Sequence, residues 1–540
     1  MTLLIGAIPV ALPAVLTIVQ AAGALTLSKR GVLVAKVDSI EDAASIDTFC
    51  FDKTGTITQN RLTLTDSRTF DGTSEDDLLS LAALASSASG MDAIDMAILD
   101  AFGRRGLPGR GDQLAYVPFS PESKRTEADV VFDGQPVRII KGAVQTVLAL
   151  CGDSATPLRA GVEQAVQGFS DRGIRAIAVA TRPEGAEDHR LRGLLGLSDP
   201  PRDDSAGIIA DLNALGITTK MITGDSVAIA REVAGQVGIG DKILGASRLR
   251  AADPEAQAQL IADSDGFTEV FPEDKYRIVR LLQGGGHLVG MTGDGVNDAP
   301  ALKQAELGTA VSEATDIAKA SASIILTQPG LSAIKEAIVV SRMTYQRMLT
   351  WVINKIVKVV EVALLHVISF FWLQQGLISL LGMSLLILAN DFATMSIATD
   401  SVKSTSSPNF WQTRSVTLAS LLIGLLFVVA DLTILGVGVY AFKLPFPQVQ
   451  TLMLLTLVFN SQFRLLLVRE RNHWYSSAPS RFLLTVCIVT IAAFALLGLV
   501  GDLTAALTWW QIAATLGFTM AAALLIDAVK YRVFRAMHIG

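Results

Sequence analysis

Long apolar segments lie on both sides of a more polar central stretch in this 540-residue chain, and this division limits the possible folds. A helix needs about 20 apolar residues to cross a bilayer. Segments that meet this requirement are 3–28, 350–373, 377–399, 416–442, 449–468, 482–501 and 509–530. Residues 37–340 have the composition of a soluble protein. The sequence therefore predicts seven transmembrane helices with one large soluble insert.

The charges beside the apolar segments indicate how the chain is oriented. Cationic residues gather in alternate connections: Lys29, Arg30, Lys36, Arg342, Arg347, Lys403, Arg414, Arg464, Arg469, Arg471, Arg481, Lys530, Arg532 and Arg535. The opposite connections carry only Lys443. The positive-inside rule then predicts a cytoplasmic insert and C-terminus. A net charge of −6, with no basic patch interleaved with aromatic residues, argues against a nucleic-acid partner.

The first apolar segment contains Pro9 and Pro13. Each proline lacks the backbone donor that a helix needs, so we expect this helix to be broken inside the membrane. Carbonyl groups freed in this way are tolerated where they line a cavity or bind an ion. The first segment is therefore a candidate part of an ion path.

Three strand-like runs in the insert each end at a turn rich in Asp and Gly. The runs are residues 47–51, 217–223 and 287–292, and each is followed by helical sequence. Doubly wound parallel sheets place their sites at the carboxyl ends of such strands. The block 60–195 interrupts this pattern and is expected to be a second domain inserted into the first.

The first of these turns begins with Asp52-Lys53-Thr54-Gly55-Thr56. An aspartate here can act as a nucleophile toward phosphorus, and the glycine lets backbone N–H groups approach a phosphoryl group. Because the carboxylate and the phosphate repel, a magnesium ion is expected between them. We expect Asp52, Asp294 and the Thr54 carbonyl to hold this ion.

The other two turns supply groups that can orient and neutralise a phosphoryl group. Asn297 and Asp298 are expected around the magnesium site. Thr223 offers a hydroxyl and an N–H, and Lys275 offers a positive charge. Any one of these residues alone is compatible with an ordinary turn, because Asp and Gly dominate turns. The occurrence of three such turns in this order argues against the interpretation that they are ordinary turns.

In these motifs the sequence resembles the P-type ATPases, whose phosphorylation domain has the haloacid-dehalogenase fold. The matching motifs are Asp52-Lys53-Thr54-Gly55-Thr56, Thr223-Gly224-Asp225, Pro272-Glu273-Asp274-Lys275 and Gly293-Asp294-Gly295-Val296-Asn297-Asp298. The resemblance implies an ATP-driven cation pump that works through a phosphoaspartate at Asp52. Lys53, Gly224 and Asp225 join the expected catalytic set through these motifs.

The resemblance extends to a nucleotide-binding domain. It implies that Phe119 stacks on adenine, with cations around the nucleotide, which suits a purine and a polyphosphate. The residues so implied are Asp95, Phe119, Lys124, Lys141, Arg175, Asp199 and Arg202. Without that context, a core phenylalanine and solvated lysines would be the ordinary interpretation.

Thr54 stands where related phosphatases have an Asp that acts as acid and base. A phosphoaspartate beside Thr54 lacks that internal base and is expected to persist. A durable intermediate is what a pump needs in order to couple hydrolysis to a conformational change.

The identity of the ion is suggested by the apolar segments. Pro9-Val10-Ala11-Leu12-Pro13 and Asn390-Asp391 resemble the plasma-membrane proton-pump branch, in which the carboxylate at Asp391 accepts the proton. Burial favours the protonated form of a carboxyl group, which suits a proton carrier. Asn354, Lys358 and Glu361 fall on one helical face of the second segment, and Glu361 stands where plant and fungal pumps have Arg. Lys358 is either a built-in counter-ion or a structural partner of Glu361, and a cation other than the proton remains open.

These observations predict four parts. They are a proline-broken helix (1–30), a phosphorylation domain (31–60 and 196–340), a nucleotide-binding domain (61–195) and a six-helix membrane domain (341–540). Nothing resembles the Thr-Gly-Glu loop of the actuator domain that family members carry with three earlier spans. One hypothesis is the catalytic part of a plasma-membrane pump, truncated or completed by a separate polypeptide. The other is a membrane protein that binds nucleotide without pumping; the apolar segments exclude a soluble phosphatase.

Overall fold

The structure is a computed structural model that describes residues 12–89 and 92–539. The chain divides into two compact units. Met1–Ile46 and Ile334–Gly540 form the membrane unit, and Asp47–Ala333 form the soluble unit.

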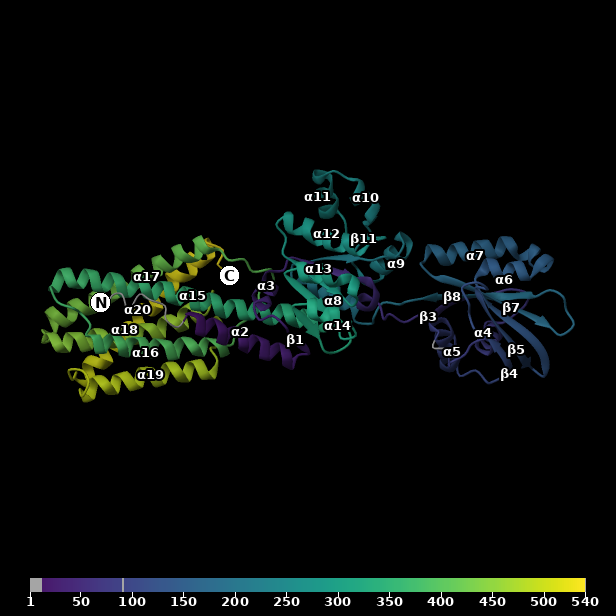
Figure 1. Cartoon of the computed structure of the whole chain (residues 1–540). Helices are drawn as coiled ribbons and strands as arrows, with labels where there is room; N and C mark the ends of the chain where they lie inside the picture. The colour runs from purple at the N-terminus through teal and green to yellow at the C-terminus, as the bar shows by residue number, and fades with distance from the viewer. Residues whose placement is uncertain (1–11, 90–91, 540) are drawn as a thin grey trace. The chain divides into compact units, whose positions relative to one another are not determined.

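A parallel sheet organises one part of the soluble unit (Figure 1). Its strands lie in the order β14-β13-β12-β2-β9-β11-β10, and every adjacent pair is parallel. The strands are β2 (Thr48–Asp52), β9 (Thr218–Ile222), β10 (Ile243–Gly245), β11 (Gly266–Thr268), β12 (Val289–Gly293), β13 (Leu307–Ala310) and β14 (Ile324–Leu326). The connecting helices are α8 (Ser205–Ala214), α9 (Val227–Val237), α10 (Ala246–Ala251), α11 (Pro254–Asp263), α12 (Pro272–Gly284), α13 (Ala299–Gln304) and α14 (Asp316–Ser321).

Strand β2 lies inside this sheet, between β12 and β9. All five of its residues are buried, as expected for a parallel strand covered on both faces. Gly290 on β12 makes room for its neighbour, because a Cβ there would lie 2.4 Å from the ring of Phe49. The strands predicted from the sequence at 47–51, 217–223 and 287–292 are confirmed as β2, β9 and β12.

A second sheet is formed by the residues between β2 and β9, and it is antiparallel throughout. Its order is β3-β8-β7-β6-β5-β4. The strands are β3 (Thr63–Thr69), β4 (Gly111–Val117), β5 (Arg125–Phe132), β6 (Gln135–Gly142), β7 (Arg175–Pro183) and β8 (Arg190–Ser198). Its helices are α4 (Glu75–Leu84), α5 (Ala93–Arg105), α6 (Val144–Leu150) and α7 (Arg159–Asp171). The first and last strands, β3 and β8, pair with each other, so the chain leaves and rejoins the parallel sheet at one place.

The membrane unit is helical (Figure 1). Its elements are α2 (Leu12–Lys29), β1 (Val32–Val34), α3 (Ser39–Ser45), α15 (Ser332–Leu373), α16 (Leu380–Met395), α17 (Thr413–Gly436), α18 (Phe446–Val468), α19 (Arg481–Val500) and α20 (Trp509–Ala536). Six helices in the described residues are long and apolar enough to cross a membrane, α15 to α20. The apolar part of α2 is shorter, Ala14–Lys29. Pro9 lies outside the described residues, and Pro13 falls in the first turn of α2, so the predicted break stays a prediction.

Helix α18 is the central helix of this unit. It contacts α16, α17, α19 and α20. In its 18-residue apolar stretch 89% of the residues are buried, whereas in that of α19 only 17% are. Polar side chains on α18 therefore face other helices rather than lipid. The sequence prediction that placed Arg464 in a cationic loop is wrong, because Arg464 lies within α18 and is 1% exposed. The predicted segment 449–468 and α18 both end at position 468, so Arg464 belongs to the membrane helix, where its charge is paired with Glu361.

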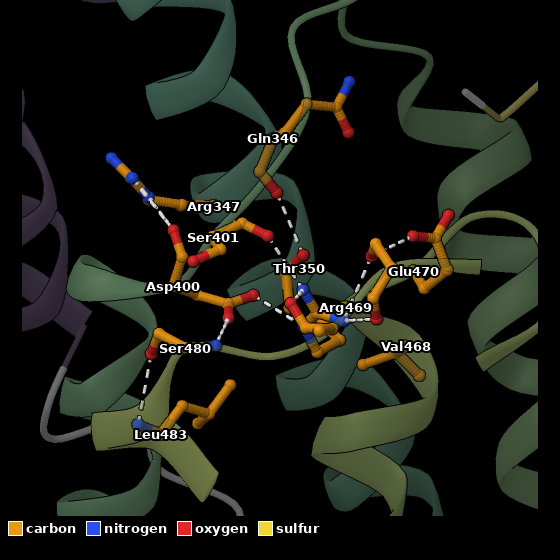
Figure 2. Close-up of polar contacts among 12 residues, drawn as sticks. Gln346, Arg347, Thr350, Asp400, Ser401, Val468, Arg469, Glu470, Ser480 and Leu483 are labelled. Atoms are coloured by element: carbon orange, nitrogen blue, oxygen red, sulfur yellow. Dashed lines mark hydrogen bonds and ion pairs between the residues drawn. The ribbon is translucent and has the colours of Figure 1, made fainter. Parts of the chain in front are cut away.

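Asp400, just beyond α16, links α15 to the end of α18 and the start of α19 (Figure 2). Its carboxylate accepts from Arg469 Nε at 2.7 Å and from the Ser480 backbone N–H at 3.0 Å. Its backbone carbonyl accepts from the guanidinium of Arg347 at 2.9 and 3.0 Å. Arg469 and Asp400 are both buried, so Arg469, also predicted as a loop cation, is a structural partner here.

Candidate functional site

The three Asp-containing turns lie at one edge of the parallel sheet. In the strand register, Asp52 is opposite Ile222 and Cys50 is opposite Met291. The residues that follow β2, β9 and β12 therefore emerge together at the carboxyl edge, where such sheets place their sites. The backbone N–H of Asp52 donates to Thr292 Oγ1 at 3.1 Å, which fixes the end of β2 against β12.

Lys275 joins two of these turns. Its ammonium donates to Asp52 Oδ2 at 2.8 Å and to Asp298 Oδ1 at 2.6 Å, and all three side chains are buried. The first turn of α12 presents this lysine, and Asp274 caps that turn by accepting from the Phe271 N–H at 2.9 Å. A second cation, Lys53, forms an ion pair with Asp225. The sequence-predicted Asp52, Lys53, Asp225, Lys275 and Asp298 are thus held in three ion pairs, two of which share Lys275.

Burial dominates the electrostatics of this edge. It raises the pKa of Asp52 to about 7, although the Lys275 charge opposes the shift. Burial also raises the pKa of Asp294, and the neighbouring Asp298 charge adds to that effect. Burial opposes the charged form of Lys275, but Asp52 and Asp298 outweigh it and raise the pKa of this lysine. The edge therefore holds more carboxyl groups than its cations can neutralise, which favours binding of a further cation.

The donor set fits a magnesium ion. Ligand atoms of Asp52, Asp294 and Asp298 lie within 4.8 Å of one another. Hard carboxylate oxygens are the donors that Mg²⁺ prefers. Gly55 has φ +71°, and a Cβ there would lie 2.2 Å from Asp294 Oδ2, so only glycine lets the two turns approach this closely.

The other predicted residues of the turns differ in how they are held. Asp298 Oδ2 accepts from the backbone N–H groups of Asp294 and Gly295, each at 3.1 Å. Thr223, followed by Gly224, is buried and accepts from the Asp225 N–H at 3.1 Å. Asn297 is exposed, and within the described residues its side chain makes no hydrogen bond.

Asp199 and Arg202 lie beside the turn that follows Asp52. Arg202 donates to the Gly55 carbonyl at 3.1 Å and to the Thr58 carbonyl at 3.2 Å. Asp199 accepts from Thr58 Oγ1 at 2.6 Å. Both residues, predicted as nucleotide ligands, thus anchor the Asp52 turn to the chain returning from the antiparallel sheet. That anchoring contact was not predicted, because it depends on the pairing of β3 with β8.

The antiparallel sheet carries the remaining predicted nucleotide residues in two different environments. Phe119, Lys124 and Arg175 are exposed. Lys141 is buried and donates to Asp95 at 2.5 Å and to Ser86 at 2.6 Å. Burial lowers the pKa of Lys141, and the Asp95 charge opposes this shift. Lys141 is therefore committed to an internal ion pair with Asp95.

A cavity of about 390 Å³ lies between the two sheets of the soluble unit. Lys53 and Asp225 line it from the phosphorylation-motif side, and Arg175 and Asp199 line it from the other. Phe119 and Lys124 do not line it. The cavity thus extends from Lys53, next to Asp52, to Arg175 of the antiparallel sheet. Side chains of both charge signs line it.

The predicted ion-path residues lie on α15 and α16, but their pairing differs from expectation. Glu361 forms an ion pair with Arg464 of α18, not with Lys358. Asn354 accepts from Arg464 Nε at 2.9 Å. Asn390 donates to the Leu386 carbonyl of its own helix at 2.9 Å, and the Asp391 side chain is partly buried.

Sequence reasoning missed Asp431, a fully buried carboxyl group on α17. It is the one acidic residue in the apolar segment 416–442, and an ionisable residue inside a membrane segment is a functional candidate. That signal was available in the sequence. The pairing of Arg464 with Glu361 was not, because it depends on how α15 and α18 pack.

Comparison with known proteins identifies related sequences along most of the chain. Residues 46–306 match the family model of haloacid dehalogenase-like hydrolases. A Methanocaldococcus jannaschii protein named as a cation-transporting ATPase is 39% identical over 493 residues, which cover 89% of this chain and 61% of that protein. Plasma membrane ATPase 1 of Saccharomyces cerevisiae is 36% identical over 493 residues, covering 88% of this chain and 53% of the yeast protein. The plasma membrane ATPase of Kluyveromyces lactis is 35% identical over 525 residues, covering 93% and 57%. The chain thus spans somewhat more than half the length of each relative.

Proposed function

We propose that this chain, a member of the P-type ATPases, carries the phosphorylation and ion-translocating parts of a plasma-membrane pump that exports protons at the expense of ATP. The observation that carries the proposal is the buried Asp52 carboxylate, held by Lys275 beside Asp294 and Asp298. The same chain has six helices long enough to cross a membrane.

In the proposed reaction, an Asp52 carboxylate oxygen attacks the γ-phosphorus of ATP. A new bond forms between this oxygen and phosphorus, the bond from phosphorus to the β–γ bridging oxygen breaks, and ADP leaves. Magnesium, held by Asp52, Asp294 and the Thr54 carbonyl, would neutralise charge on the phosphoryl oxygens. Lys275 orients the Asp52 carboxylate, and Thr223 and Asp298 hold the turns around the phosphoryl group.

The nucleotide is assigned to the antiparallel sheet, residues 61–195, as a domain inserted between residues 31–60 and 196–340 of the phosphorylation domain. Support comes from the cavity that Lys53 shares with Arg175, and from the exposed ring of Phe119, which is free to stack on a base. Lys124 supplies a further exposed cation, whereas Lys141 and Asp95 stabilise the sheet from within.

The transported ion is assigned to the membrane unit, with residues 1–30 as a seventh, proline-broken helix beside the six of residues 341–540. Asn354, Lys358, Glu361, Asn390 and Asp391 form the proposed path, with Pro9 and Pro13 on the first helix. The names of the fungal relatives, plasma membrane ATPases, support a plasma-membrane location. Hydrolysis of the phosphoaspartate is assigned to an actuator region, which can be supplied by a separate polypeptide.

Phosphorylation tests this proposal directly. Purified chain should incorporate phosphate from γ-labelled ATP only with Mg²⁺, and hydroxylamine should release it as expected for an acyl phosphate. Asp52→Asn should abolish the label. Asp47→Asn, an identical change immediately before the start of the same strand, should retain it. Equal labelling of the two variants, or no label in the parent, would refute the proposal.

The ion assignment has its own test. With the actuator region present, ATP hydrolysis is measured against pH and against K⁺ in the parent, Asp391→Asn and Glu361→Gln. Turnover that requires a metal cation at fixed pH would exclude the proton and favour another monovalent or divalent cation. A phosphate label that forms on Asp52 but is not hydrolysed at any pH or K⁺ concentration tested would favour a nucleotide-binding membrane protein that does not pump.

A further inference from the structure

Three helices of the membrane unit bring a cluster of fully buried polar side chains together. Glu361 lies on α15, Asp431 on α17, and Asn460 and Arg464 on α18, and none is more than 1% exposed. Asn460 Nδ2 donates to Asp431 Oδ1 at 2.7 Å. Arg464 donates to Glu361 Oε2, and the Glu361 and Asp431 carboxyl groups lie close enough to interact with each other.

Three oxygen atoms of this cluster have no hydrogen-bond donor among the described residues. They are Glu361 Oε1, Asp431 Oδ2 and Asn460 Oδ1. All three are acceptors once the carboxyl groups are ionised, and a buried acceptor without a donor costs about 1–3 kcal/mol. The cluster therefore lacks a donor at the place where two carboxyl groups meet.

The net charge of the cluster also indicates that a positively charged donor is missing from it. Two carboxylates and one guanidinium sum to −1 in an environment closed to water. Lys358, one turn from Glu361, interacts electrostatically with both Glu361 and Asp391, but it forms no ion pair or hydrogen bond with either among the described residues. Arg464 is therefore the one cation in direct contact with this pair of carboxyl groups within the described part of the chain. Two buried carboxyl groups that share a site cannot both remain ionised at low cost.

We propose that Glu361 and Asp431 form a proton-binding site in which one proton bridges the two carboxyl groups. This inference rests on the proposed pump function and adds the Glu361–Asp431 pair to the proposed ion path as a proton site distinct from Asp391. The proton enters from water and bonds to one carboxylate oxygen while the other accepts a hydrogen bond. The cluster then becomes neutral, and two of its three unpartnered oxygens are satisfied.

A proton fits this site better than a metal cation does. Ca²⁺ requires six to eight oxygen ligands and Mg²⁺ requires six in octahedral geometry. The cluster offers three unpartnered oxygens, and the Arg464 guanidinium next to them would repel a metal ion. A proton requires only one donor position between two acceptors.

Infrared spectroscopy of the full chain in lipid tests the proposal. A protonated carboxyl group in an apolar site has a carbonyl stretch separate from those of amides and carboxylates. This band should be present in the parent and lost in Asp431→Asn. An asparagine at position 431 can donate to Glu361 Oε1 in place of the proton, so the variant should melt at or above the temperature of the parent.

The matched control is Asp391→Asn, the same change on α16, which should retain the band. Glu361→Gln should lose the band as Asp431→Asn does, while its amide oxygen still accepts from Arg464. A band that survives in Asp431→Asn, or that disappears only in Asp391→Asn, would overturn the proposal. The absence of the band from the parent would do the same.

Labelling of Asp52 by Mg-ATP is measured in the same samples. A parent that shows the band without the label would refute the pump and leave the proton site standing. A labelled parent whose band does not depend on Asp431 would refute the proton site alone.

Discussion

Asp52→Asn should stabilise the folded chain, and the gain should depend on pH. The carboxyl group of Asp52 has its pKa raised by burial from 3.8 to about 7. The unfolded chain therefore loses this proton at lower pH than the folded chain does. Between these two values the folded state binds more protons than the unfolded state, so the free energy of unfolding falls as pH rises. Above about pH 7 the folded chain carries the full free-energy cost of burying the ionised Asp52 carboxylate.

The magnitude follows from the size of the shift. A difference of about three pKa units at about 1.36 kcal/mol per unit amounts to roughly 4 kcal/mol. Asparagine has the same shape and stays neutral, and its carbonyl oxygen can still accept from Lys275. The variant should therefore gain little near pH 4 and up to roughly 4 kcal/mol near pH 8. Active-site carboxylates commonly impose such a cost on stability.

Thermal unfolding of the full chain, monitored without Mg²⁺ at about pH 5 and about pH 8, measures this difference. The Asp52→Asn variant should melt higher than the parent, by a larger margin at the higher pH. Excess Mg²⁺ should narrow the margin, because an ion bound by the carboxylates stabilises the parent. A margin that is equal at both pH values, or larger at the lower one, would refute the reasoning.

Three further substitutions test other parts of the site. Gly55→Ala should abolish labelling, because its Cβ would lie 2.2 Å from Asp294 Oδ2, whereas Gly72→Ala, with nearly the same φ and nothing within 4 Å, should retain it. Thr54→Asp should shorten the phosphoenzyme lifetime by about 10²–10⁴-fold in a chase with unlabelled ATP, since it supplies an acid–base group, and an unchanged lifetime would contradict this. Lys141→Met should lower stability by about 3–5 kcal/mol, measured by thermal unfolding, because its buried carboxylate partner loses the only cation it contacts among the described residues. A loss below about 1 kcal/mol would show that this ion pair contributes little.

The sequence was most informative where function depends on residues close to a strand end. Asp52, Thr223 and Asp294 could be placed together because parallel strands share one carboxyl edge. The prediction that Lys275 neutralises this edge also needed only the motif. Its two simultaneous contacts, to Asp52 and to Asp298, came from the structure.

The sequence was least informative where function depends on how helices pack. Glu361 could be recognised as a buried acid, but its partner is 103 residues away on α18. Arg464 was interpreted as a loop cation because a charge usually marks the end of a membrane segment. Only the position of α18 at the centre of the unit shows that Arg464 and Asn460 face inward. Periodicity within one helix cannot give the register between two.

The most direct test of the central claim is to locate the phosphate by mass spectrometry after brief exposure of the chain to Mg-ATP and acid quenching. The peptide that contains Asp52 should carry one phosphate, bound to that carboxyl group, and Asp47→Asn should leave it in place. Phosphate found on a hydroxyl side chain, or on no residue at all, would contradict the account.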